Sequence, residues 1–290
     1  MTEASFRAHR GRLEGLLREG LAIKWKHGLE NVEELRENQD VLLTFQCGVE
    51  VKSSFVVAAD GVHSTVRKSF LPPHEAEPNV LAFVVFNGKN RVARKVFDEV
   101  YEPALKEEGM CEVKLEGGVV LGISVIGVGE DEVGVSWTYS RRSNGKDEKL
   151  WRPERSTEGA KVIPESFYEE VRALEALDLE QPFKEVFGEE QVRADRVLHW
   201  LMRTVLVSLG RLRWLGSKNV FFLGDALHAE PILGGEGANA ALVDGFQMGE
   251  WIARKGKEGV DMWYENRYGA WEKGVEESVR DIAGMHEERR

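Results

Sequence analysis

The residues best suited to chemistry lie in one stretch, residues 224–244, with the sequence GDALHAEPILGGEGANAALVD. An apolar run at 219–223 delivers a carboxylate, Asp225, which can accept hydrogen bonds from the hydroxyl groups of a polyol. Glycines follow Pro231 and allow a flat ligand to approach the backbone closely. This stretch therefore indicates a site for a flat small molecule that carries hydroxyl groups.

A helix is predicted directly after these glycines, from about residue 237 to residue 254. Its free N–H groups and partial positive charge would face the turn and favour an anion or an electron-rich carbonyl. An ordinary strand–turn–helix connection explains the turn, but not the full spacing. The helix is expected to pack closely on a sheet through one shared face, formed by Ala238, Ala241, Leu242, Gly245, Met248 and Ile252.

A second stretch, residues 56–67, reads VVAADGVHSTVR. Asp60 and Gly61 alone favour a tight turn. Ser64 and Arg67 complete a longer pattern, in which the Arg67 guanidinium is expected to brace the loop through paired hydrogen bonds.

The elements that must position these residues are of two kinds. Strands are predicted at 41–45, 54–59 and 219–223, and helices at 5–21, 164–176, 182–187 and 260–280. Between residues 80 and 135 the pattern changes to short β-rich pieces broken by glycine, such as 119–128. These pieces, with 133–139, predict an antiparallel sheet in a second domain.

Composition limits the class of partner. The chain has 290 residues, 42% of them hydrophobic, and a formal net charge of −11. That charge disfavours nucleic acid and anionic membranes, so a small-molecule partner is expected. No apolar run is long enough to cross a bilayer and residues 1–18 do not resemble a signal peptide, so a cytoplasmic location is expected. Cys47 and Cys111 suggest neither a zinc site nor a disulfide.

Residues 224–244 resemble the second FAD-binding motif of the class A, para-hydroxybenzoate hydroxylase-like, flavoprotein monooxygenases, written GDAxHxxxPxxGxGxNxAxxDA. Gly245 stands where that motif usually has alanine. Residues 56–67 resemble the DG motif of the same family, with Ala59 in place of the usual leading glycine. The residues in register with the second motif are Gly224, Asp225, Ala226, His228, Pro231, Gly235, Gly237, Asn239, Ala241 and Asp244.

The resemblance implies an α/β fold: an FAD/NAD(P)-binding domain of the glutathione reductase-like, para-hydroxybenzoate hydroxylase type, with an inserted, mostly antiparallel substrate domain. The expected parts are 1–79 and 201–290 for the FAD-binding domain and 80–200 for the substrate domain. The family's N-terminal GxGxxG turn has no counterpart here, because Gly11, Gly15 and Gly20 lack its spacing. The domain is therefore expected to be N-terminally truncated.

The resemblance also implies site residues. Asp225 would bind the ribityl chain, Asp60 would lie near the pyrophosphate, and Pro231 near the oxygen-reactive face of the flavin. Arg10, with Leu13 and Leu17, resembles the RxxLxxxL helix that carries a flavin-contacting arginine. The motif histidine is mostly structural in this family, so His228 is not assigned as a catalytic base, and no metal site is predicted. The further cofactor-binding residues are Gly61, Gly234, Gly235, Gly237, Ala238 and Asn239.

The implied activity is that of an FAD-dependent monooxygenase. NADPH or NADH would reduce FAD, and a flavin C4a-hydroperoxide would hydroxylate or epoxidise a small organic substrate, of aromatic or secondary-metabolite type, with dioxygen. Two alternatives stay open: an inactive truncated flavoprotein that acts at most as a binding module, and a flavin-dependent dehydrogenase or reductase of the same fold. The residues leave the substrate, the choice of NADH or NADPH and the oligomeric state undecided.

Overall fold

The computed structural model describes residues 8–35, 40–105, 109–145, 148–234 and 236–287. The chain divides into two units. We call residues 1–23, 82–201 and 285–290 the sheet unit, and residues 24–81 and 202–284 the motif unit. The N-terminal helix thus groups with the sheet, whereas the sequence placed residues 1–79 together in one part.

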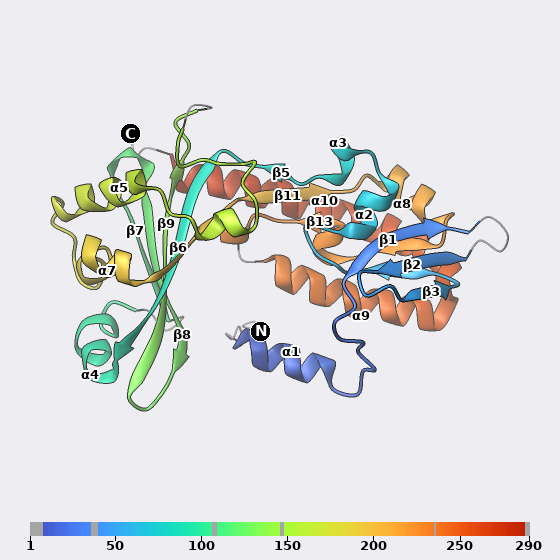
Figure 1. Cartoon of the computed structure of the whole chain (residues 1–290), viewed down its shortest axis with the longest axis horizontal. Coiled ribbons are helices and arrows are strands. Elements are labelled where there is room, and N and C mark those ends of the chain that lie inside the picture. The colour runs from blue at the N-terminus through green and yellow to red at the C-terminus, as the bar shows by residue number, and fades with distance from the viewer. Residues whose placement is uncertain (1–7, 36–39, 106–108, 146–147, 235, 288–290) are drawn as a thin grey trace. The chain divides into compact units, whose positions relative to one another are not determined.

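The sheet unit is built on a five-stranded antiparallel sheet with the order β10-β6-β9-β8-β7 (Figure 1). Its two long strands, β6 and β9, pair over their full length. The antiparallel sheet predicted from the glycine-broken β pattern is therefore confirmed. The elements of this unit are α1 (Arg10–Arg18), β6 (Phe83–Ala93), α4 (Arg94–Val96), β7 (Met110–Lys114), β8 (Val120–Val128), β9 (Glu132–Arg142), α5 (Glu165–Glu175), α6 (Phe183–Val186), α7 (Glu189–Ala194) and β10 (Arg196–Trp200).

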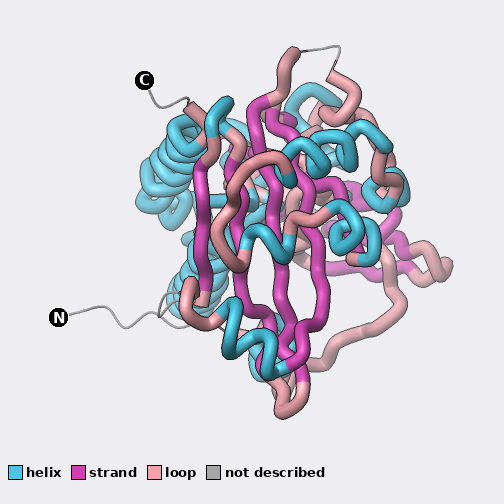
Figure 2. The backbone as a smooth tube through the Cα atoms, turned by 90° about the vertical axis from the view of Figure 1, so that its left-hand side faces the viewer, coloured by secondary structure: helices cyan, strands magenta, loops and turns pink. Residues whose placement is uncertain are grey.

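Aromatic packing between the sheet and its helices forms the core of this unit. Phe86 on β6 stacks on Phe167 of α5, with ring centroids 3.8 Å apart. Trp137 on β9 is fully buried and crosses β6 at Gly88, where an added Cβ would lie 2.0 Å from the indole. Only glycine fits at that crossing. Figure 2 shows helical segments in front of the long strands.

The motif unit contains three smaller sheets. Strands β1, β2 and β3 form an antiparallel meander, β13, β11 and β5 form a second sheet, and β12 pairs with β4 in parallel. Helices α9 and α10 are its longest elements (Figure 1). The elements of this unit are β1 (Leu29–Glu34), β2 (Val41–Phe45), β3 (Glu50–Ser53), β4 (Val56–Ala58), α2 (Thr65–Phe70), α3 (Pro73–Ala76), β5 (Asn79–Val80), β11 (Arg203–Leu206), α8 (Leu209–Gly216), β12 (Val220–Phe222), β13 (His228–Ala229), α9 (Gly237–Lys255) and α10 (Val260–Met285).

Tyr264 of α10 completes the hydrogen bonding of β12. Phe222 N donates to the Tyr264 hydroxyl at 2.7 Å, and that hydroxyl donates to Phe222 O at 3.1 Å. Strand β12 therefore has a backbone partner in β4 and a side-chain partner in α10. This closes its second edge and holds α10 against the strand that leads to Asp225.

The face of α9 that is buried differs from the predicted one. Met248 is buried as predicted, but Leu242 is 41% exposed and Gly245 is exposed, and Asp244, which was not part of the predicted face, is buried. In the folded chain Asp244 is surrounded by hydrogen-bond donors, so the helix is rotated toward it.

Candidate functional site

Two parallel strands bring the sequence motifs to one edge. Val56 is in register with Val220 and Ala58 with Phe222, and Leu223 N donates to Ala58 O at 3.1 Å. Since the carboxyl ends of parallel strands meet at the same edge of a sheet, the loops that start at Asp60 and at Asp225 leave from neighbouring positions. The motif unit thus joins stretches that lie far apart in the sequence.

The turn that carries Asp225 lies tightly against α9. Gly224 has a φ of +56°, and an added Cβ there would be 3.0 Å from the Cβ of Ala241. Asp225 Oδ1 lies 3.7 Å from the position that a Cβ would take on Gly237, the first residue of α9. The small residues at 224, 237 and 241 therefore allow the carboxylate to lie beside the start of the helix.

The Asp225 carboxylate is available for a ligand. Within the described ranges no hydrogen-bond donor of the protein reaches it, and the residue is exposed to solvent. The protein packed around it nevertheless raises its pKa through burial, and His228 opposes that rise in part. A partly desolvated carboxylate without a partner is a strong acceptor for hydroxyl groups.

The Asp60 carboxylate is engaged instead. Its Oδ2 accepts hydrogen bonds from Thr65 N at 2.7 Å and Val66 N at 3.2 Å, at the start of α2. Ser64 Oγ accepts from Arg67 N at 3.0 Å, which caps the same helix. Gly61 has a φ of +81° and makes the turn between them. Asp60 therefore holds its own loop closed.

Arg67 connects the two loops. Its side chain is fully buried, and it donates to three backbone carbonyls: Nε to Ala76 O at 2.7 Å, and the terminal nitrogens to Ala226 O at 2.7 Å and Val62 O at 2.5 Å. Burial lowers the pKa of Arg67, and Asp60 partly restores it. Ala226 follows Asp225 directly, so the bracing role predicted for Arg67 is confirmed.

Two further polar motif positions, His228 and Asp244, bind each other. His228 Nε2 lies 2.5 Å from Asp244 Oδ2, and both side chains are buried. Burial alone would raise the pKa of Asp244, but hydrogen bonds from His228, Trp271 and Arg267 lower it overall. The His228 ring also stacks on Trp271 at 5.1 Å. This arrangement agrees with a structural histidine.

The other predicted residues lie on the same turn or elsewhere in the chain. Pro231 is buried, Gly234 ends a short helix at Ile232–Gly234, and Ala238 is exposed on the first turn of α9. Asn239 donates to Glu236 Oε2 at 3.1 Å. Gly235 lies outside the described residues.

Arg10 belongs to the sheet unit rather than the motif unit. On α1 it forms an ion pair with Glu14 at 2.8 Å, and its side chain is 92% exposed.

Sequence reasoning missed Trp271 as a partner of the motif and did not give a role to Tyr264 or Arg267. The three residues are spaced along α10 so that they share one face. The signal in the sequence is this spacing of two aromatic residues and an arginine on a strongly charged helix.

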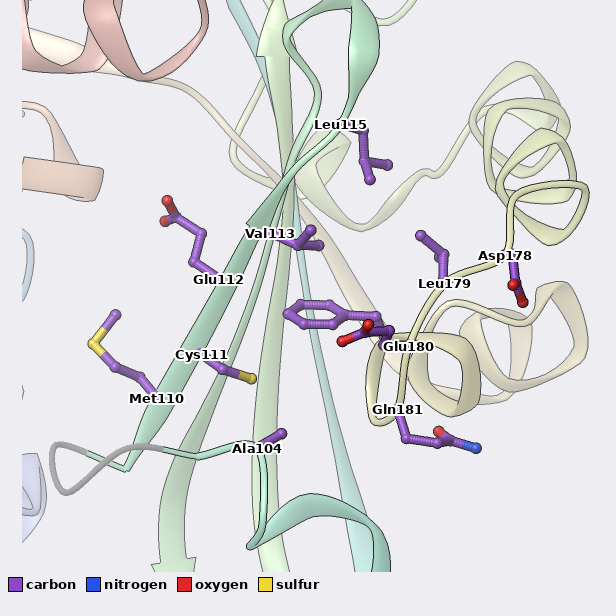
Figure 3. A pocket seen from close by; sticks show the side chains of 11 residues that line it. Ala104, Met110, Cys111, Glu112, Val113, Leu115, Asp178, Leu179, Glu180 and Gln181 are labelled. Carbon is purple, nitrogen blue, oxygen red and sulfur yellow. The ribbon is translucent and has the colours of Figure 1, made fainter.

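The sheet unit has a cavity of about 850 Å³ beside the edge strand β7 (Figure 3). Val113 and Cys111 point toward the segment that carries Asp178, Leu179 and Glu180 (Figure 3). Burial raises the pKa of the Cys111 thiol. The cavity is therefore lined by both apolar side chains and carboxylates.

Neither a metal centre nor a membrane span is evident in the part of the chain that the structure describes. No group of three or more His, Cys, Asp and Glu side chains there could hold a metal ion. No helix there combines the length and the apolar character that crossing a bilayer requires. Cys47 is free and exposed, and Cys111 is free and buried.

Comparison with known proteins points to a single family. Residues 13–270 match the family described as FAD binding domain. The FAD-dependent monooxygenase nscC of Trichophyton tonsurans is 33% identical over 264 residues, which cover 90% of this chain and 62% of that protein. The FAD-dependent monooxygenase aptC of Emericella nidulans is 35% identical over 237 residues, covering 81% of this chain and 55% of that protein. This chain thus spans less than two thirds of the length of these curated relatives.

A solved structure shows the same fold. A putative FAD-containing monooxygenase from Photorhabdus luminescens superposes with a TM-score of 0.69 at 20% identity, covering 96% of this chain and 73% of that one. The predicted fold class is therefore confirmed.

Proposed function

The chain belongs to the FAD-binding domain family of the class A flavin monooxygenases, and we propose that it forms the ribityl-binding and substrate-bearing part of an FAD-dependent monooxygenase. The observation that carries this proposal is the state of the Asp225 carboxylate. It is the motif carboxylate that no described donor of the protein engages, beside the start of α9.

The residues around Asp225 fit a flavin. The ribityl chain carries hydroxyl groups, which a free carboxylate accepts. Gly224 and Gly237 leave no side chain between the turn and the helix, so a flat group can lie close to the backbone. The N-cap residue Glu236 makes no side-chain cap to α9, so the first N–H groups of that helix are available to an electron-rich carbonyl.

In this proposal, several of the other motif residues hold the loops of the site in place. Arg67 holds the Asp225 turn to the Asp60 loop, and the buried pair of His228 and Asp244 holds that turn to α9. Asp60 positions its loop through α2, so its contribution near the pyrophosphate would be indirect. Arg10 is proposed as a flavin contact only because its helix resembles the RxxLxxxL motif of the family.

When bound, FAD would take electrons from NADPH or NADH and activate dioxygen for hydroxylation or epoxidation of a small organic substrate. The sheet unit would present that substrate, since sheets with adjacent cavities supply apolar binding surfaces. The relatives' names as FAD-dependent monooxygenases support this activity. A substrate of secondary-metabolite type and a cytoplasmic location remain part of the proposal.

The test is flavin retention by the purified chain. After mixing with FAD and gel filtration, we expect the visible flavin spectrum to elute with the protein near one flavin per chain. NAD(P)H-dependent oxygen uptake coupled to a hydroxylated or epoxidised product would then support the monooxygenase. Flavin reduction without product would support the dehydrogenase or reductase alternative. A folded protein that elutes without flavin would reject flavin binding by this chain and favour the non-catalytic alternative.

A further inference from the structure

A separate cavity of about 480 Å³ lies between the second half of α9 and the first turns of α10. A short 3-10 turn, Lys257–Gly259, joins the two helices. Counted from the first lining residue on each helix, the others follow at three, four, seven or eight positions, so each set forms one helical face. The lining consists of Gln247, Glu250, Trp251, Arg254, Lys255, Trp263, Asn266 and Arg267.

Two indole rings make this cavity aromatic. Trp263 is 2% exposed and packs edge-on against Trp271, with ring centroids 5.2 Å apart. Trp251, from α9, contributes the second ring and lies under the ammonium group of Lys255, at 4.5 Å from the ring centroid. Rigid indole faces of this kind favour a flat, unsaturated ligand.

The cavity also holds buried donors without acceptors. Trp263 Nε1 and Arg267 Nε are both buried, and neither has a hydrogen-bond partner in the described structure. Trp251 Nε1 is unpartnered as well, although it lies against Gly259. Buried donors in folded proteins nearly always have an acceptor, and here three of them belong to side chains that line one cavity. An oxygen-bearing ligand would supply what they lack.

The charge around the cavity favours an anion. Arg254 is paired with Glu250 at 3.1 Å, and Arg267 with Asp244 at 3.1 Å. Among the described residues Lys255 has no carboxylate partner; its ammonium contacts the Trp251 ring and Met262 Sδ. One uncompensated positive charge therefore stays at the rim.

From these observations we propose that the groove between α9 and α10 binds a small aromatic carboxylate. The ring would lie between the indoles, and the carboxylate would accept from Trp263 Nε1 and Arg267 Nε while Lys255 neutralises its charge. Trp251 lies about 21 Å along α9 from Gly237, at 1.5 Å per residue. The groove thus lies farther along α9 than the Asp225 turn, to which it is linked through Arg267 and Asp244. The proposal for the groove does not rest on the proposed function.

The test is isothermal titration calorimetry of the whole chain with 2-naphthoate and with neutral 2-naphthylmethanol. We expect one site for the acid and an affinity for the alcohol at least about tenfold lower, as the loss of one charge-assisted hydrogen bond implies. Lys255→Gln should weaken binding of the acid by about tenfold and leave binding of the alcohol unchanged. The matched control is Lys273→Gln, because Lys273 is an exposed lysine farther along α10 that faces Glu277 at 3.8 Å; it should change neither.

A second variant, Trp263→Phe, keeps an aromatic ring and removes the N–H donor. It should keep the circular dichroism spectrum of the parent and still bind the acid several-fold more weakly. Equal affinity for acid and alcohol would show an apolar groove without anion recognition and would overturn the proposal. Absence of binding, or binding that survives Lys255→Gln unchanged, would overturn it as well.

Discussion

The Asp60 and Asp225 loops both follow a parallel strand, but among the described residues hydrogen-bond donors of the protein reach only the Asp60 carboxylate. Each presents a carboxylate just after one of two paired parallel strands. After Asp60, helix α2 starts almost at once and turns two backbone N–H groups onto the carboxylate. After Asp225, residues 226–236 intervene before α9, and the carboxylate keeps no protein partner among the described residues. The distance to the next helix thus decides whether backbone N–H groups reach the carboxylate, and it leaves Asp225 free for the ligand that we propose.

The largest expected effect is on the affinity for FAD, which should depend far more on the Asp225 carboxylate than on the Asp60 carboxylate. Asp225→Asn should weaken FAD binding by about a hundredfold, because it removes a charge-assisted acceptor for the ribityl hydroxyls. Asp60→Asn should change the affinity only a few-fold. Titration of FAD against each purified variant measures both. If Asp60→Asn has the larger effect, the assignment of roles to the two loops is wrong.

Asp225→Asn should not lower the stability of the protein, although it should weaken FAD binding. Its folded pKa is raised by burial, so its contribution to stability is present below the unfolded pKa and is lost as pH rises through the folded pKa. At pH 7 the charged form therefore opposes folding, and Asp225→Asn should be at least as stable as the parent in urea unfolding. A clear loss of stability would show that the carboxylate has a structural partner.

The next largest effect is expected from replacing Arg67, which connects the Asp60 loop to the Asp225 loop. Arg67→Met should lower the free energy of unfolding by about 3 kcal/mol or more, because three carbonyls, two of them buried, lose their donor. FAD affinity should fall with it, since Ala226 O lies next to Asp225. Arg211→Met is the matched control: Arg211 pairs with Glu75 at a partly exposed site, and its loss should change stability little. Equal effects of the two substitutions would contradict the bracing role.

The smallest effect tests Asp60 as a helix cap. Asp60→Ala should reduce the unfolding free energy by about 1 kcal/mol, the usual cost of losing a side-chain cap. Ser64→Ala should cost a similar amount, because Ser64 Oγ caps the same turn. Urea unfolding followed by circular dichroism measures both. A stability unchanged by Asp60→Ala, together with a large fall in FAD affinity, would return Asp60 to a direct role near the pyrophosphate.

The sequence by itself predicted the local elements of the site. The strand at 219–223, the helix from residue 237 and the antiparallel sheet all follow from apolar periodicity, and the structure has β12, α9 and the five-stranded sheet in those places. Turn glycines such as Gly61 and Gly224 were also readable, because their backbone adopts positive φ values that other residues rarely take. These features depend on neighbours in the chain.

Tertiary structure alone decided what each polar side chain contacts. Asp244 was a motif position with no predicted contact, and it is buried because His228, Arg267 and Trp271 converge on it from other elements. The family resemblance placed Asp60 and Asp225 beside different parts of FAD, but only the fold shows that the backbone of α2 engages Asp60. Burying a charge is costly unless partners surround it, and those partners come from distant parts of the chain that only the fold brings together.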